Sequence, residues 1–232
     1  MRHRTKNRGW YLAVVPAVAF ALAASSFRYV DVYLPNTPSD PITGAVGETL
    51  HIEQTAVAEG VENLIVADVT LTGAARLREE DKPSLPAGTE IDVIAVSFDW
   101  AAPPESPLRT CDLQLVTVGG EHYLPSARLG SHLVGAAPEL SSTHYCTPED
   151  APGPLMSLGV DLGFSGYEDP ERPAEWSTTV YFVVPAGTRP ASVKLSWQMP
   201  TYLEFTGVEV SGEEALSSLS SAGAMNTSAA MK

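Results

Sequence analysis

Prolines and glycines interrupt this chain so often that long helices are excluded from most of it. The 232 residues include 19 prolines and 18 glycines. Proline removes a backbone donor and glycine favours turns, so both suit short strands joined by turns. Hydrophobic residues make up 44% of the sequence, which is enough to build a buried core. A chain of this length has room for one ordinary domain with flanking segments.

One segment near the N-terminus departs from this pattern. Trp10–Ala24 is uncharged and apolar, and the uncharged stretch continues to Phe27. A basic head before an apolar run directs export of the chain that follows it. We therefore expect residues 1–9 to be a cytoplasmic basic head and residues 10–27 to be a transmembrane signal-anchor. The basic residues of the head are Arg2, Arg4, Lys6 and Arg8.

The same segment also fits a cleavable signal peptide, because Ala21-Leu22-Ala23 supplies small residues at a cut site. A retained anchor needs about 17–25 residues to cross the hydrocarbon core. Both alternatives export the body of the protein. The anchor makes it a single-pass protein of the cell membrane, with a cytoplasmic N-terminus and an extracytoplasmic body.

Small residues recur every three to four positions along this segment, which would let a helix of a membrane-protein partner pack closely. An alanine-rich anchor without a partner would carry the same pattern. The residues concerned are Ala13, Ala17, Ala21 and Ala24.

Charge is distributed unevenly along the chain. The net charge is −14, and all 28 acidic residues lie at or beyond Asp31. An acidic body is repelled by DNA, RNA and anionic lipid headgroups. We therefore exclude nucleic acid as a partner.

A proline-rich spacer is expected over residues 28–48, which contain Pro35, Pro38 and Pro41. Beyond it, short segments rich in β-branched and aromatic residues predict strands. In the clearest of them the apolar positions change parity at Val93–Ile94, which predicts a β-bulge there. The expected strands are Thr49–Gln54, Leu64–Thr72, Glu90–Trp100, Asp112–Val118, Glu121–Leu124, Thr178–Val184, Ser192–Gln198 and, at an edge, Glu204–Val210.

The fold class predicted from this pattern is all-β. We expect an immunoglobulin-like antiparallel β-sandwich over residues 49–210, preceded by one N-terminal transmembrane helix. Residues 211–232 are rich in serine and alanine, and we expect them to form a disordered tail.

The order of these segments carries a resemblance. A β-branched strand comes first, and the next strand ends in Phe98-Asp99-Trp100. The hairpin strand Leu113–Val118, residues 122–126 and the cysteine pair follow it. Val180–Pro185 then leads into Ala191–Leu195. This resembles the telokin-like, immunoglobulin-like extracytoplasmic domains of anchored envelope proteins in high-GC Gram-positive bacteria. The resemblance covers roughly residues 64–200. It implies a β-sandwich in the cell envelope, with no catalytic residues to carry over and no known function.

Cys111 and Cys146 are the two cysteines of the chain, and both follow the export segment. An even number of cysteines in an oxidising compartment favours a disulfide. Closing a loop of about 35 residues would stabilise the fold by roughly 3–4 kcal/mol. Two free thiols are the alternative.

No catalytic or metal-binding pattern stands out. His122, His132 and His144, together with Cys146, match no standard spacing of zinc ligands. No glycine loop surrounds a serine as a nucleophile elbow requires, and no phosphate-binding loop is present. We therefore expect a protein that is not an enzyme and has no cofactor and no metal.

Aromatic residues offer a different kind of site. Trp100 and Trp197 fall in expected strands and should be buried. Tyr145, Tyr167 and Trp176 fall between expected strands, which makes them the candidate contact surface. The leading interpretation is a non-catalytic, membrane-anchored interaction module, with an accessory subunit of a membrane complex as one role. The alternative is an envelope module that binds a glycan, peptide or cation, and neither interpretation identifies the ligand.

Overall fold

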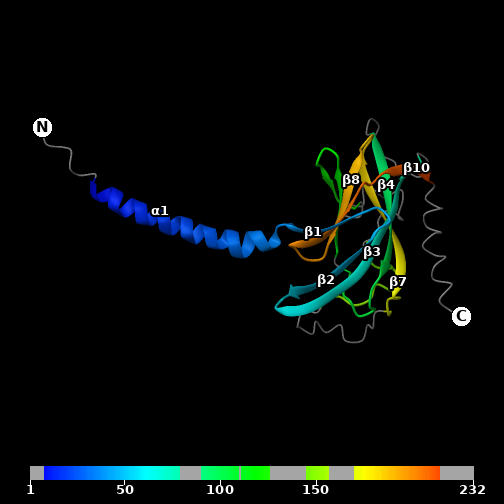
Figure 1. Cartoon of the computed structure of the whole chain (residues 1–232), viewed down its shortest axis with the longest axis horizontal. Coiled ribbons are helices and arrows are strands. Elements are labelled where there is room, and N and C mark those ends of the chain that lie inside the picture. Colours follow the sequence, from blue (N-terminus) through cyan, green and yellow to red (C-terminus); the bar gives the residue numbers. More distant parts are fainter. Residues whose placement is uncertain (1–7, 79–89, 110, 126–144, 157–169, 215–232) are drawn as a thin grey trace.

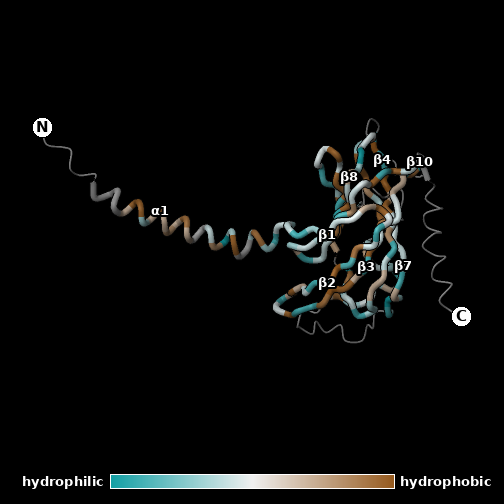
Figure 2. The backbone as a smooth tube through the Cα atoms, in the orientation of Figure 1, coloured by the Kyte–Doolittle hydropathy of each residue, from teal (hydrophilic) through white to brown (hydrophobic). Residues whose placement is uncertain are grey.

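The computed structural model describes residues 8–78, 90–109, 111–125, 145–156 and 170–214, with side chains except at 8–12, 24–25, 31–32 and 213–214. Helix α1 (Arg8–Arg28) is followed by a π-helical turn, η1 (Tyr29–Tyr33), and a 3₁₀ turn, η2 (Leu34–Asn36). Figure 1 shows α1 extending away from the strands, and Figure 2 shows hydrophobic residues along it.

Within the described ranges, no helix is both long and apolar enough to cross a membrane. The transmembrane helix expected at residues 10–27 is therefore not found there.

In the same ranges, ten strands form two sheets that pack as a sandwich, which confirms the all-β prediction at that level. The first sheet has the order β1 (Asp40–Ala45), β9 (Thr201–Thr206), β8 (Pro190–Ser196), β5 (Asp112–Thr117), β6 (His122–Tyr123). The second has the order β10 (Val210–Glu214), β3 (Val61–Leu77), β4 (Ile91–Ala101), β7 (Glu175–Pro185). Strand β2 (Thr49–Ala58) also pairs with β3.

The long strand β3 organises the second sheet. One of its edges pairs with β4, and the other pairs first with β2 and then with β10. Glu59 and Gly60 join β2 to β3 with φ angles of 49° and 83°. Two residues with positive φ suit the tight turn whose twist matches a hairpin. The strands expected at Asp112–Val118 and Glu121–Leu124 also form a hairpin, as β5 pairs antiparallel with β6.

Both boundaries of the domain differ from the predicted residues 49 and 210. Strand β1 lies inside the segment expected to be a spacer, and β10 extends to Glu214 inside the expected tail. Pro41 is tolerated in β1 because that strand lies at a sheet edge. The strand expected over 204–210 is divided, since Gly207, with φ of 71°, separates β9 from β10.

Two strand pairings are parallel, contrary to the expected antiparallel sandwich: β1 with β9 and β10 with β3. Each of these pairs joins segments far apart in the chain. No hairpin therefore imposes an antiparallel direction on them.

The predicted bulge at Val93–Ile94 is wrong. Strand β4 pairs with β7 in unbroken register from Ile91 to Ala101. The irregularity lies instead in β3, between Leu71 and Gly73. The apolar positions of β4 change parity because β4 is buried on both faces at its first half and on one face at its second half.

Two apolar clusters result from this arrangement. The main core lies between the sheets and includes Phe98, Trp100 and Phe205. The second cluster lies on the other face of the β3–β4–β7 sheet, which we call the outer face. Its buried members are Leu77, Val93, Ala95, Tyr181 and Val183.

Candidate interaction site

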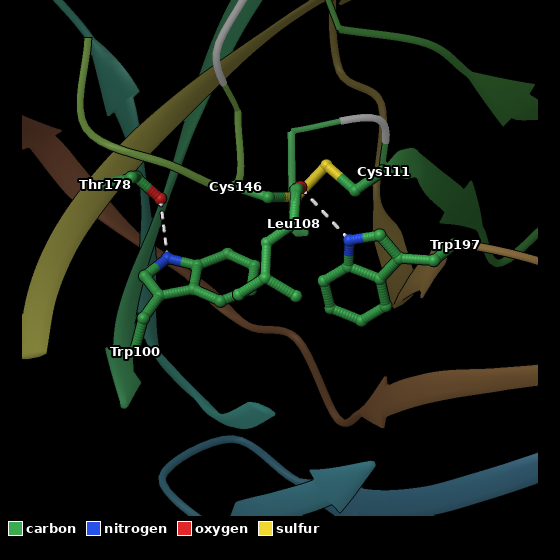
Figure 3. Close-up of a disulfide and its surroundings, with 6 residues drawn as sticks. All are labelled: Trp100, Leu108, Cys111, Cys146, Thr178 and Trp197. Atoms are coloured by element: carbon green, nitrogen blue, oxygen red, sulfur yellow. Dashed lines mark hydrogen bonds between the residues drawn. A yellow bond between two sulfur atoms is a disulfide. The ribbon is translucent and has the colours of Figure 1, made fainter. Parts of the chain in front are cut away.

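The predicted disulfide is confirmed. Cys111 and Cys146 are joined, with 6.3 Å between their Cα atoms. Both residues are buried in the main core. Figure 3 shows the disulfide beside Trp100, Leu108 and Trp197. The bond therefore holds the segment that contains Cys146 against the start of β5.

Tryptophan side chains fill this end of the core. Trp100 and Trp197 are buried, as predicted, and their rings meet edge to face at 6.3 Å. Each indole N–H has an acceptor: Trp100 donates to Thr178 Oγ1 at 2.8 Å, and Trp197 donates to the Leu108 carbonyl at 3.1 Å (Figure 3). Buried indoles normally need such partners.

Two of the three residues expected to form an exposed aromatic contact surface are buried. Trp176 is 6% exposed and Tyr145 is 8% exposed. Strand β7 begins earlier than predicted, so Trp176 lies opposite Trp100 in the register, and the two rings stack at 5.9 Å. Tyr145 precedes Cys146 and is drawn into the core with it. Tyr167 lies outside the described residues.

Arg172 is a buried residue that sequence reasoning did not single out. It is 1% exposed, and its guanidinium lies 4.8 Å from the centre of the Trp176 ring. It donates to the carbonyl oxygens of Ser106 and Pro103 at 2.8 and 2.6 Å. Burial lowers the pKa of Arg172 to about 10, an effect that Glu105 partly opposes. This cation therefore fixes the turn at 103–106 to the segment that leads into β7.

The exposed part of the outer face carries polar side chains in rows across the strands. Residues facing each other on adjacent strands point to the same face of a sheet. The first row runs through β2, β3, β4 and β7 and consists of Thr49, Thr70, Asp99 and Ser177. The second row contains His51, Asp68, Ala101 and Glu175. We call these two rows the polar half of the outer face.

Short hydrogen bonds connect neighbours within the polar half. The hydroxyls of Thr49 and Thr70 lie 2.7 Å apart, and Ser177 donates its hydroxyl to Asp99 at 2.6 Å. His51 Nδ1 lies 2.7 Å from an oxygen of Asp68. These contacts order exposed side chains that would otherwise be free to rotate.

A groove of about 750 Å³ lies over the polar half. Its lining residues include three acids, Asp68, Asp99 and Glu175, and both threonines of the first row. Such a surface can accept hydrogen bonds from a partner and attract positive charge.

The polar half contains Ser177 and His51, whose side chains are of types that can act in catalysis. Ser177 is bonded to Asp99 while His51 is bonded to Asp68, so the hydroxyl and the imidazole have different carboxylate partners. No group of three or more potential metal ligands gathers among the described residues. His122 is bonded to Gln114, and Cys146 is in the disulfide. His132 and His144 lie outside the described residues.

The alanines expected to pack against a partner helix lie on α1. Ala13, Ala17 and Ala21 are exposed, and the side chain of Ala24 is outside the description. Their packing role stays a prediction.

Comparison of the chain with protein-family models, with curated proteins and with solved structures finds no significant match.

Proposed function

We propose that this protein is a non-catalytic interaction module displayed on the outer side of the cell membrane, where it serves as an accessory subunit of a membrane protein complex. The observation that carries the proposal is the polar half of the outer face. It presents ordered carboxylates and hydroxyls across four strands, and the core beneath it contains a disulfide. A rigid, exposed and acidic surface is suited to docking a protein.

Export is supported by the disulfide and by α1. Structural disulfides persist in oxidising compartments. The exposed apolar side chains of α1 include Val14, Val15, Phe20 and Leu22, which at 3.6 residues per turn point in different directions around the helix. A helix that is apolar all round is suited to an apolar environment. In this proposal the body that carries the disulfide lies outside the cytoplasm.

The relation to immunoglobulin-like and telokin-like domains is part of the proposal. It is supported by two packed sheets in which β8 and β9 form a hairpin. It also fits the strand order in which consecutive strands β4 and β5 belong to opposite sheets.

A ligand-binding module of the envelope is the second candidate. The observation that favours it is the combination of three hydroxyl groups and one carboxylate in the first row of the polar half. Such groups can hydrogen-bond a polyhydroxylated ligand as well as a protein. A soluble glycan would then bind without any membrane partner.

The test is purification of the full chain, tagged at its C-terminus, from native membranes in mild detergent, followed by mass spectrometry. We expect a stoichiometric integral-membrane partner that survives washing. The variant Ser177→Lys is purified in parallel. It places a positive charge in the polar half, which should repel a cationic partner and lower the amount of partner that is recovered. Recovery of the wild-type protein alone would contradict the accessory-subunit proposal.

The N-terminus of the purified protein gives a second readout. An intact N-terminus would show that residues 1–27 are retained in the mature protein. A new N-terminus just beyond Ala23 would show that the segment is removed, and it would rule out packing of α1 against a partner helix.

A further inference from the structure

Strand β3 has an open edge beyond the end of β4. Strand β4 pairs with β3 only from Asp68 onward, where Asp68 faces Ala101. On its other side β3 pairs with β2 down to Val61. In the described part of the chain, no strand pairs with residues 62–66 on the β4 side.

The backbone direction along this edge follows from the β2–β3 turn. A two-residue turn makes its flanking residues, Ala58 and Val61, a hydrogen-bonded pair. The N–H and C=O groups of Glu62, Leu64 and Val66 then point away from β2. The Val66 N–H confirms this direction, because it donates to Ser106 Oγ at 2.9 Å. The backbone groups of Glu62 and Leu64 therefore face the open side.

A groove of about 400 Å³ runs along this edge. Pro103, Ser106, Pro107 and Leu155 lie across it from β3. Leu64 is 56% exposed and Leu155 is 58% exposed, so the groove is accessible and partly apolar. Arg172 holds the carbonyls of Pro103 and Ser106, which fixes the far wall in place. A preformed groove lowers the entropy cost of binding.

The charges around the groove are of one sign. Glu62 and Glu105 are among its lining residues, and no lysine or arginine is found in that described lining. Asp68 continues the acidic surface into the polar half. A second copy of this acidic chain would be repelled, whereas a segment with lysine or arginine would be attracted.

We propose that the open edge of β3 at residues 62–66 binds an extended, positively charged polypeptide segment as an added strand. Backbone groups of Glu62 and Leu64 pair with the segment, its apolar side chains contact Leu64 and Leu155, and its basic residues meet Glu62 and Glu105. Strand addition of this kind obtains affinity from main-chain hydrogen bonds and specificity from side-chain contacts. The inference rests on the proposed interaction function and identifies the chemistry of the partner.

The test uses the full chain in detergent micelles and a synthetic probe. The probe is a peptide of about ten alternating valines and threonines with a lysine pair at each end. We expect it to bind at least about tenfold more tightly than the same peptide with glutamate pairs. Backbone NMR should show slowed hydrogen exchange at the amides of Glu62 and Leu64. N-methylation of alternate peptide amides should abolish this protection.

Two variants with the same change in charge locate the site. Leu64→Lys should weaken binding of the lysine peptide by about tenfold. Val118→Lys, at a position that is 73% exposed in the β5–β6 turn, should leave binding within about twofold. Equal binding of both peptides, equal effects of both variants, or protection at Thr55 in place of Leu64 would overturn the inference. Because the probe is added to purified protein, failure here is distinguishable from failure to capture a membrane partner.

Discussion

The outer face of the second sheet is divided into two halves that differ although β3, β4 and β7 contribute to both. At one end Val93, Ala95 and Tyr181 are buried in an apolar cluster. At the other end Thr70, Asp99 and Ser177 lie in one row under a groove, and Ser177 donates a hydrogen bond to Asp99. The apolar half contributes to the fold, as a second core does. The polar half gains little stability from its contacts, which fits the proposed role of this half in binding a partner.

The largest expected effect is a difference in the free energy of unfolding between substitutions in the two halves. Val93→Asp places a charge where the side chain is fully buried, and it should lower the free energy of unfolding by about 4 kcal/mol. Asp99→Val at the exposed end of the same strand should change it by less than about 1 kcal/mol. Urea unfolding of the full chain in detergent measures both. Similar losses of unfolding free energy in the two variants would show that the two halves do not differ in their contribution to stability.

The next effect concerns the support beneath the polar half. Arg172→Ala removes two hydrogen bonds to carbonyls and uncovers the Trp176 ring, so it should cost about 3 kcal/mol. Arg172→Lys keeps the charge but lacks the planar fork that reaches both carbonyls. It should recover less than half of that loss. Full recovery by lysine, measured by the same unfolding experiment, would show that charge alone matters.

A third substitution should change partner binding with little change in the stability of the fold. Thr70→Val keeps the shape of a half-buried strand residue and removes its contact with Thr49. We expect a change of at most about 0.5 kcal/mol in unfolding free energy. Capture of the membrane partner should nevertheless fall. Unchanged capture would remove Thr70 from the contact surface and narrow it to the carboxylates.

The smallest effect lies on the other sheet and serves as a reference for exposed carboxylates. Glu121 accepts hydrogen bonds from the Thr117 hydroxyl and from its own backbone N–H, which lower its pKa. A lowered pKa stabilises the fold above the ordinary glutamate pKa, and this contribution is lost as the pH falls through the folded value. NMR titration should show the Glu121 pKa rising in Thr117→Val. An unchanged pKa would contradict this origin.

The sequence predicted the two-layer β fold, the disulfide and the burial of Trp100 and Trp197. It did not predict that Trp176 stacks on Trp100, because that contact depends on the register between β4 and β7. Their register is fixed by pairing across a long stretch of chain, and nothing local indicates it. The parity change in β4 was a correct signal with a wrong interpretation, since burial on both faces produces the same pattern as a bulge.

Arg172 and the polar half were also missed, for a related reason. Arg172 is an ordinary charged residue in a segment of prolines and acids, and only the structure brings it to the carbonyls at 103–106. The members of the first polar row are single residues on four strands. Their alternation with apolar residues predicts only that each of them faces solvent, as most polar residues in strands do. Their alignment into one surface is a property of the sheet.

Site-specific photo-crosslinking in native membranes tests the central claim most directly. A photoreactive residue is placed at Ser177, in the polar half, and in a separate protein at Val118, which is exposed on the other sheet. The account predicts one discrete crosslinked partner from position 177 and none from position 118. Crosslinking from both positions alike, or from position 118 alone, would contradict the assignment of the polar half as the interaction surface.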